Sequence, residues 1–85
     1  MDKYEKMQEV FTLSNIAFRK LMDLKDDLRA ELKALLVSEG AKDIDKIQNV
    51  EAYGKALIIE AQMEKIGTQA EHLSAFIDEL IRIDI

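Results

Sequence analysis

Apolar side chains recur at alternating steps of three and four residues through most of the first half of the chain. They are Tyr4, Met7, Phe11, Phe18, Leu21, Leu28, Leu32 and Leu35. A second series fills the other half, at Ala52, Ala56, Ile59, Met63, Ile66, Ala70, Leu73, Ile77 and Leu80. This spacing places each series on one stripe of an α-helix, as in coiled coils. The pattern predicts an all-α fold, an antiparallel hairpin of two long helices.

The first series is flanked on both sides by residues that are suited to helix ends. Asp2 precedes it, and a carboxylate there can accept hydrogen bonds from the free N–H groups of the first turn. Gly40 follows it, and glycine is favoured where a helix ends in the left-handed conformation. We therefore expect a single helical domain over residues 1–85, divided into a helix 2–39, a connector 40–49 and a helix 50–83.

The connector contains two isoleucines three residues apart, Ile44 and Ile47. That spacing suits a single helical turn, which would place both side chains on the end of the hairpin. The second helix could begin at Asp43 or at Asn49, because both side chains can cap a helix. We favour Asn49, which has Glu51 in its first turn.

A competing architecture depends on the glycines of the second half. Gly54 and Gly67 each cost about 1 kcal/mol relative to alanine inside a helix. Thr68 and Glu71 directly follow Gly67 and match a capping box, which marks a helix start. A break near Gly67 would give a compact three-helix bundle. The apolar series nevertheless keeps its phase across Gly67, and this favours one continuous helix.

Two polar residues, Ser14 and Lys25, interrupt the first apolar series. A lysine at such a position can lay its methylene groups along the stripe and bring its ammonium to the edge. We expect it to lie beside Glu60 or Glu64 of the second helix. A single polar residue on the stripe would also penalise wrong registers and wrong oligomers.

The chain contains more apolar residues than the two apolar stripes account for. We take as candidate interface residues Leu13, Ile16, Leu24, Leu57, Ile58, Phe76, Ile81 and Ile83. A lone hairpin would expose many of them, and contiguous exposed apolar patches usually mark interfaces. The chain is too short to supply a further helix that covers them. We therefore expect a homodimer or higher oligomer in which hairpins pair into a four-helix bundle.

Charge and composition exclude several classes of partner. The net charge of −5 is spread along 85 residues, and Arg19, Arg29 and Arg82 form no basic run. Such a chain repels phosphate, so direct nucleic-acid binding is not expected. Its apolar runs are too short to span a bilayer, and no signal-peptide pattern opens it. We expect no membrane association and a cytoplasmic location.

Residue patterns that carry chemistry are missing from the sequence. His72 has no potential metal ligand three or four residues away, so we interpret it as exposed to solvent. Asp23, Asp27 and Glu31 form an acidic ridge without the glycine-bearing loop of a calcium site. The aromatic residues of the first series have the spacing of core residues. We expect no catalytic residues, no metal and no cofactor.

Three functions are compatible with these features. The first is a non-enzymatic module for protein–protein interaction, a self-associating acidic bundle that acts as an adaptor, chaperone or regulator of another protein. The second is a small acidic inhibitor, encoded by a phage or mobile element, that occludes a basic site on a nucleic-acid enzyme. The third is an enzyme whose site is shared across a dimer interface, beside Arg19 or Arg29.

Overall fold

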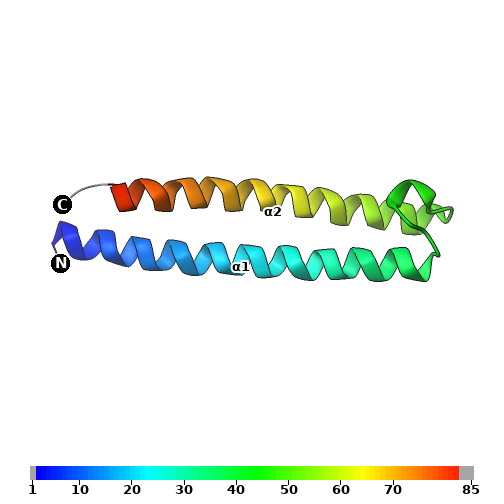
Figure 1. Ribbon diagram of the computed structural model, residues 1–85, viewed down its shortest axis with the longest axis horizontal. Helices are drawn as coiled ribbons and strands as arrows, with labels where there is room; N and C mark the ends of the chain where they lie inside the picture. The colour runs from blue at the N-terminus through cyan, green and yellow to red at the C-terminus, as the bar shows by residue number, and fades with distance from the viewer. Residues whose placement is uncertain (1, 83–85) are drawn as a thin grey trace.

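The computed structural model describes residues 2–82 and contains two long helices that lie side by side (Figure 1). Helix α1 spans Lys3–Ser38, the short 3-10 helix η1 spans Ile44–Lys46, and α2 spans Val50–Arg82. The helices run in opposite directions, and the start of α1 and the end of α2 lie at the end of the rod opposite η1. No strand occurs in this part of the chain. The predicted antiparallel helical hairpin is confirmed.

Both ends of α1 are formed by the residues that the sequence indicated. The Asp2 carboxylate accepts a hydrogen bond from the Glu5 N–H at 2.8 Å, which is a side-chain cap. At the other end Gly40 has a φ of 61°, in the left-handed region. The Ala41 N–H then bonds the Leu36 carbonyl at 2.9 Å, closing a Schellman motif. These local bonds fix α1 to within one residue of its predicted bounds at each end.

The connector folds back under the hairpin and closes its end. Ile47 is buried there against Ala52 and Ala56, and Ile44 packs on the same cluster. The side chain of Asn49 accepts a hydrogen bond from the Ala52 N–H at 3.0 Å, so Asn49 caps α2. The predicted helical turn and the choice of Asn49 over Asp43 are both confirmed.

Helix α2 is continuous through Gly67, so the alternative of a three-helix bundle is wrong. The Thr68 hydroxyl donates to the Glu64 carbonyl one turn earlier at 3.1 Å instead of capping a new helix. The Thr68 hydroxyl therefore has a hydrogen-bond acceptor within the continuous helix. The glycine has a different role, because Lys25 of α1 lies directly over it.

The hairpin is a thin rod with a small core. It measures 58 × 16 × 15 Å and has a radius of gyration of 18.2 Å, against about 12 Å for a compact domain of this length. Between residues 2 and 82, the buried apolar side chains are all alanine or isoleucine, at Ile47, Ala52, Ala56, Ile59, Ala70 and Ile77. The two helices alone therefore bury little apolar surface.

The aromatic residues of α1 are less buried than their spacing predicts. Tyr4 remains 48% exposed and Phe11 36% exposed, while Phe18 is half-buried. A single opposing helix cannot cover a large ring on all sides, whereas it fully encloses small residues such as Ala56. The prediction that Tyr4 and Phe11 belong to the core is wrong. Ser14, one of the two polar residues on the same stripe, is buried.

Candidate interaction surface

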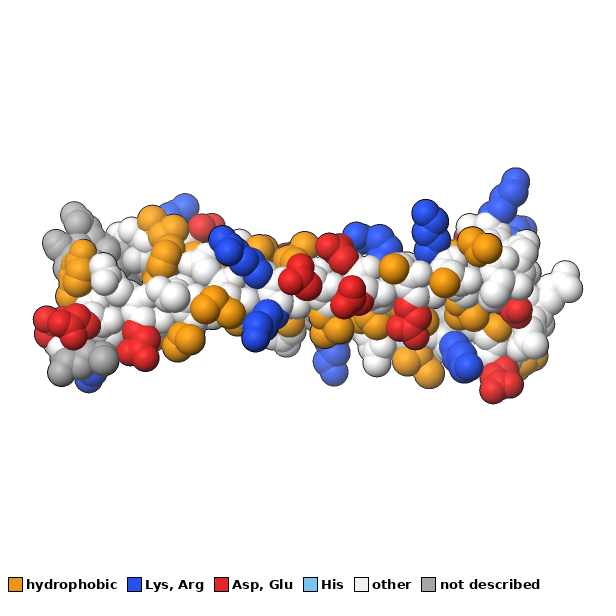
Figure 2. Space-filling model, turned by 90° about the horizontal axis from the view of Figure 1, so that it is seen from below, with side chains coloured by type: hydrophobic (Ala, Val, Ile, Leu, Met, Phe, Trp, Pro, Cys, Tyr) orange, Lys and Arg blue, Asp and Glu red, His pale blue; other side chains and the backbone are white. Residues whose placement is uncertain are grey.

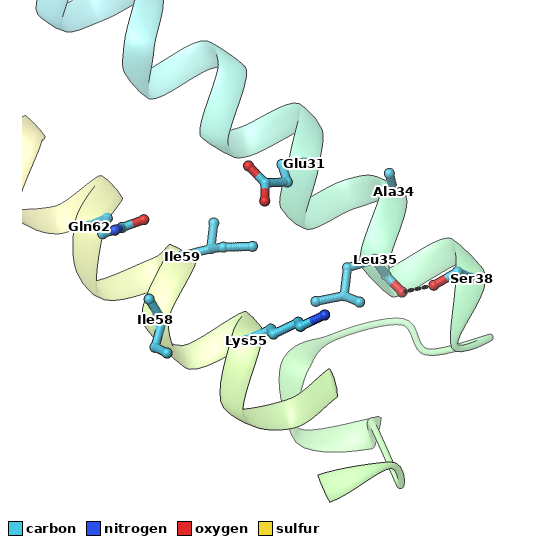
Figure 3. A pocket seen from close by; sticks show the side chains of 8 residues that line it. All are labelled: Glu31, Ala34, Leu35, Ser38, Lys55, Ile58, Ile59 and Gln62. Carbon is cyan, nitrogen blue, oxygen red and sulfur yellow. Dashed lines mark hydrogen bonds between the residues drawn. The ribbon is translucent and has the colours of Figure 1, made fainter. Parts of the chain in front are cut away.

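A groove of about 550 Å³ lies between the helices near the connector (Figure 3). Its walls come from both helices, with Leu35 on α1 and Ile59 on α2 extending toward the opposite helix. Lys55 also reaches across from α2. The Ser38 hydroxyl is already occupied, because it donates to the Leu35 carbonyl at 2.8 Å. The lining is completed by Glu31, Ala34, Ile58 and Gln62.

A second groove of about 440 Å³ continues the first toward the middle of the rod. Gln62 lines both, so the two hollows are neighbours. Leu24 and Leu28 form the α1 wall, and Ile66 is the apolar residue of the α2 wall. Lys65 and Gln69 complete the lining. Aliphatic side chains from both helices therefore line this groove together with longer polar side chains.

A third groove, of about 330 Å³, lies near the chain ends and is lined by Lys3, Lys6, Met7, Val10 and Leu80. Lys3, Val10, Leu24, Glu31 and Ser38 are separated by steps of seven or fourteen residues, so they form one row along α1. Since this row lines all three grooves, the grooves open on the same side of the rod. We call this side the groove face.

The structure divides the candidate interface residues between different sides of the rod. Leu24 and Ile58 line the grooves directly. Leu13 lies seven residues from Lys6, and Phe76 seven from Gln69, which places both on the groove face. Both are exposed. Four of the eight candidates therefore share one face.

The remaining candidates lie elsewhere. Ile81 follows Gly67 by two heptads, so it lies on the edge of α2 that contacts Lys25. Leu57 lies next to that edge, on the side of α2 that faces away from α1. Ile16 points away from α2 on the outer side of α1, where it is exposed. Ile83 lies outside the described residues. The candidates within residues 2–82 are all exposed, but the sequence did not sort them into faces.

Val10 belongs to the groove face and was absent from the candidates. It is exposed and helps to line the groove near the chain ends. The signal was present in the sequence, because Val10 precedes Leu24 by two heptads. A row beside the main stripe is easily overlooked when only the stripe itself is followed.

Charged side chains are interspersed with apolar ones along the outer side of the rod (Figure 2). Within residues 2–82 one ion pair occurs, between Arg29 and Asp26 at 3.0 Å, and both side chains are largely exposed. Such a pair contributes little to stability. Lys25 accordingly forms no ion pair with Glu60 or Glu64, and that expectation is wrong.

Potential metal ligands do not gather into a site in the described part of the chain. His72 is exposed, and no group of three or more His, Cys, Asp or Glu residues there could hold a metal ion. The acidic ridge Asp23, Asp27 and Glu31 is exposed along its length. What the groove face offers is apolar surface bordered by lysine, glutamine and glutamate side chains.

Neither described helix combines the length and apolar character needed to cross a membrane. No family model matches the chain, and neither a curated protein nor a solved structure is similar to it.

Proposed function

We propose that the protein is a non-enzymatic interaction module that self-associates through its groove face into a four-helix bundle. The observation that carries the proposal is the excess of exposed surface. The chain exposes 6641 Å², whereas a compact monomer of this mass exposes about 5,100 Å². The difference, about 1,500 Å², is more than one partner contributes to a standard interface.

The groove face is the side best suited to that contact. The aliphatic side chains that line its grooves would be removed from water, while the lysine, glutamine and glutamate side chains could remain partly hydrated. An apolar centre with a polar rim is the usual composition of a protein interface. A second hairpin can bury both walls of the grooves at once, which a single helix cannot do as fully.

A matched pair of substitutions tests the proposal. Leu24 is 47% exposed on the groove face, and Leu57 is 41% exposed away from it. Leu24→Glu should therefore abolish self-association, while Leu57→Glu should leave it intact. Light scattering coupled to gel filtration at several concentrations measures both masses against 9.7 kDa for one chain. A wild-type protein that stays monomeric at about 100 µM would contradict the proposal, since specific homodimers form well below that concentration.

In the assembled bundle, a separate surface of α2 would bind another protein. Tyr53 and Leu57 are exposed there beside Glu60 and Glu64, and Ile81 is exposed further along the helix. This combination suits a partner segment that is both apolar and basic, for which the bundle would act as an adaptor, chaperone or regulator. Affinity capture should retain the same partner at low and high salt if apolar contacts dominate. The Leu57→Glu, Ile81→Glu double variant should lose it while remaining associated with itself.

A further inference from the structure

Apolar side chains lie on two opposite sides of α2 near its start. Ala52, Ala56 and Ile59 are buried on the side that packs against α1. On the side that faces away from α1, Val50 is 85% exposed, and Leu57 follows it by one heptad and is also exposed. A helix that is apolar on both sides is typical of one that is covered on both sides. This exposed apolar surface therefore indicates a partner other than α1.

A row of small side chains runs along the same outward side of α2. It recurs every seven residues, at Gly54, Ala61, Thr68 and Ala75. Larger residues follow each of them three and four positions later, so they form a ridge on either side of the row. The first ridge consists of Val50, Leu57, Glu64, Glu71 and Asp78. The second begins with Ile58 and Lys65, which border the groove face. We call the row and its two ridges the outer face of α2, and its shape suits a ridge of another helix.

Gly54 supports a close approach at this row. A glycine inside a helix costs about 1 kcal/mol relative to alanine. The space over Gly67 is used by Lys25 of α1, whereas the space over Gly54 is open. Helix axes come closest where the side chains at the contact are small. A helix docked on the outer face would use the space that the hairpin itself leaves empty.

Charge on the outer face specifies the kind of helix. Beyond Val50 and Leu57, the first ridge contains only exposed carboxylates, at Glu64, Glu71 and Asp78. The second ridge is mixed, with Lys65, His72 and Glu79, and Arg82 ends the row. A complementary partner therefore has apolar residues opposite one end of the first ridge and Lys or Arg opposite the rest.

The outward row of α1 does not have this composition. It consists of Glu9, Ile16, Asp23, Ala30 and Val37, and so contains two carboxylates and no base. Laid on the outer face of α2 in either direction, it would bring no positive charge to Glu64 or Glu71. The charge pattern therefore favours a different protein over a further copy of the chain.

We infer that the outer face of α2 binds a basic amphipathic helix of another protein. This inference rests on the proposed binding of another protein to α2 and specifies that partner, and it is independent of the contact at the groove face. The partner helix lies nearly parallel to the axis of α2, because the row of small residues has a seven-residue period. It approaches most closely at Gly54 and Ala61, and its basic residues lie along Glu64 and Glu71.

Synthetic helices test the charge of the partner. The probe is an alanine-based peptide of about 25 residues, a length that is partly helical in water. Leucines occupy one end of a stripe with three-and-four spacing, and lysines occupy the rest. It is made in both sequence orders, so that either direction along α2 is matched. The control peptide has glutamate in place of each lysine. By fluorescence anisotropy, the better lysine peptide should bind at least about tenfold more tightly than either glutamate peptide. Equal affinities would overturn the inference.

Substitutions in the row of small residues test where the lysine peptide binds. Ala61→Leu fills the row and should weaken binding about tenfold, because the peptide can no longer approach closely. Ala30→Leu is the matched control at an exposed position on the outward row of α1, and should change the dissociation constant less than about twofold. Circular dichroism verifies that both variants keep their helicity. Equal effects of the two substitutions would overturn the inference.

A matched pair of charge variants separates a site from general attraction to an acidic protein. Glu64→Lys with Glu71→Lys should weaken binding of the lysine peptide about tenfold. Glu9→Lys with Asp23→Lys changes the net charge by the same amount on α1 and should have an effect of less than about threefold. Equal losses in the two double variants would mean that net charge alone attracts the peptide, and would overturn the inference.

The remaining outcomes distinguish this inference from the proposed function. A natural partner that the Leu57→Glu, Ile81→Glu variant still captures would overturn the proposed binding to α2 itself. If that variant loses the partner but Ala61→Leu keeps it, the surface stands and the docked helix is wrong. Wild-type assemblies larger than a dimer that dissociate on Ala61→Leu would assign the outer face to a further copy and overturn the inference. A monomeric wild type that binds the lysine peptide through Ala61 would overturn the self-association alone.

Discussion

The ammonium end of Lys25 lies directly over Gly67 of the opposite helix. A Cβ atom placed on residue 67 would stand 3.2 Å from Lys25 Nζ and 3.8 Å from its Cε. Lys25 on the stripe of α1 and Gly67 inside α2 are therefore parts of one contact. The glycine leaves the space through which the lysine chain crosses the seam. This relationship also helps to fix the register of the two helices.

Replacing Gly67 with alanine tests this contact. Alanine is favoured inside a helix by about 1 kcal/mol, but its Cβ would press on the end of Lys25. The flexible ammonium can move by a few tenths of an ångström, so Gly67→Ala should stabilise the protein by about half of that gain. In a Lys25→Ala background the full gain should return. Urea unfolding of the wild type, the two single variants and the double variant, at one fixed protein concentration, measures the coupling free energy between residues 25 and 67. Equal gains in both backgrounds would mean that the lysine does not restrain this site.

The sequence predicted those parts of the fold that depend on neighbouring residues. Asp2, Gly40 and Asn49 act within one turn of their own positions, so residue type alone indicated their roles. The contact between Lys25 and Gly67 depends on the relative position of two helices, which periodicity leaves open by whole turns. The exposure of Tyr4 was also missed, because spacing gives a residue's direction but not how much of it the opposite helix covers.

Two glycines should respond to alanine in opposite directions. Gly40 has a positive φ, and alanine in the left-handed region costs about 1 kcal/mol or more. Gly54 lies inside α2 with open space where an alanine methyl group would stand, so alanine there should stabilise the protein by about 1 kcal/mol. Denaturation midpoints of the two variants provide the measurement. A stabilising Gly40→Ala would show that the end of α1 has another conformation in solution.

Ala56 marks the most tightly packed point of the hairpin. It is 0% exposed and lies in the cluster with Ile47 and Ala52. Ala56→Leu should destabilise the protein by about 1–3 kcal/mol, because the added methyl and methylene groups have no free volume. Ala61→Leu, on an exposed position of the same helix, is the matched control and should stay within about 0.5 kcal/mol. Equal effects would contradict the packing of the connector onto the hairpin.

Replacing Lys25 with leucine should change the stability of the protein and its selectivity for one oligomeric state in opposite directions. In Lys25→Leu an apolar side chain continues the stripe between Leu21 and Leu28, and its burial should raise stability by about 1 kcal/mol. The variant also loses the polar residue that penalises registers and oligomers in which position 25 is fully enclosed. We therefore expect a higher melting temperature together with a broader distribution of oligomeric masses. Lys33→Leu, at an exposed position of α1, controls for the loss of charge.

Calorimetry and native mass spectrometry on the two variants measure the melting temperature and the distribution of oligomeric masses. A Lys25→Leu protein with a single oligomeric mass and a melting temperature within about 1 °C of the wild type would show that Lys25 is a solvated edge residue with no role in specificity.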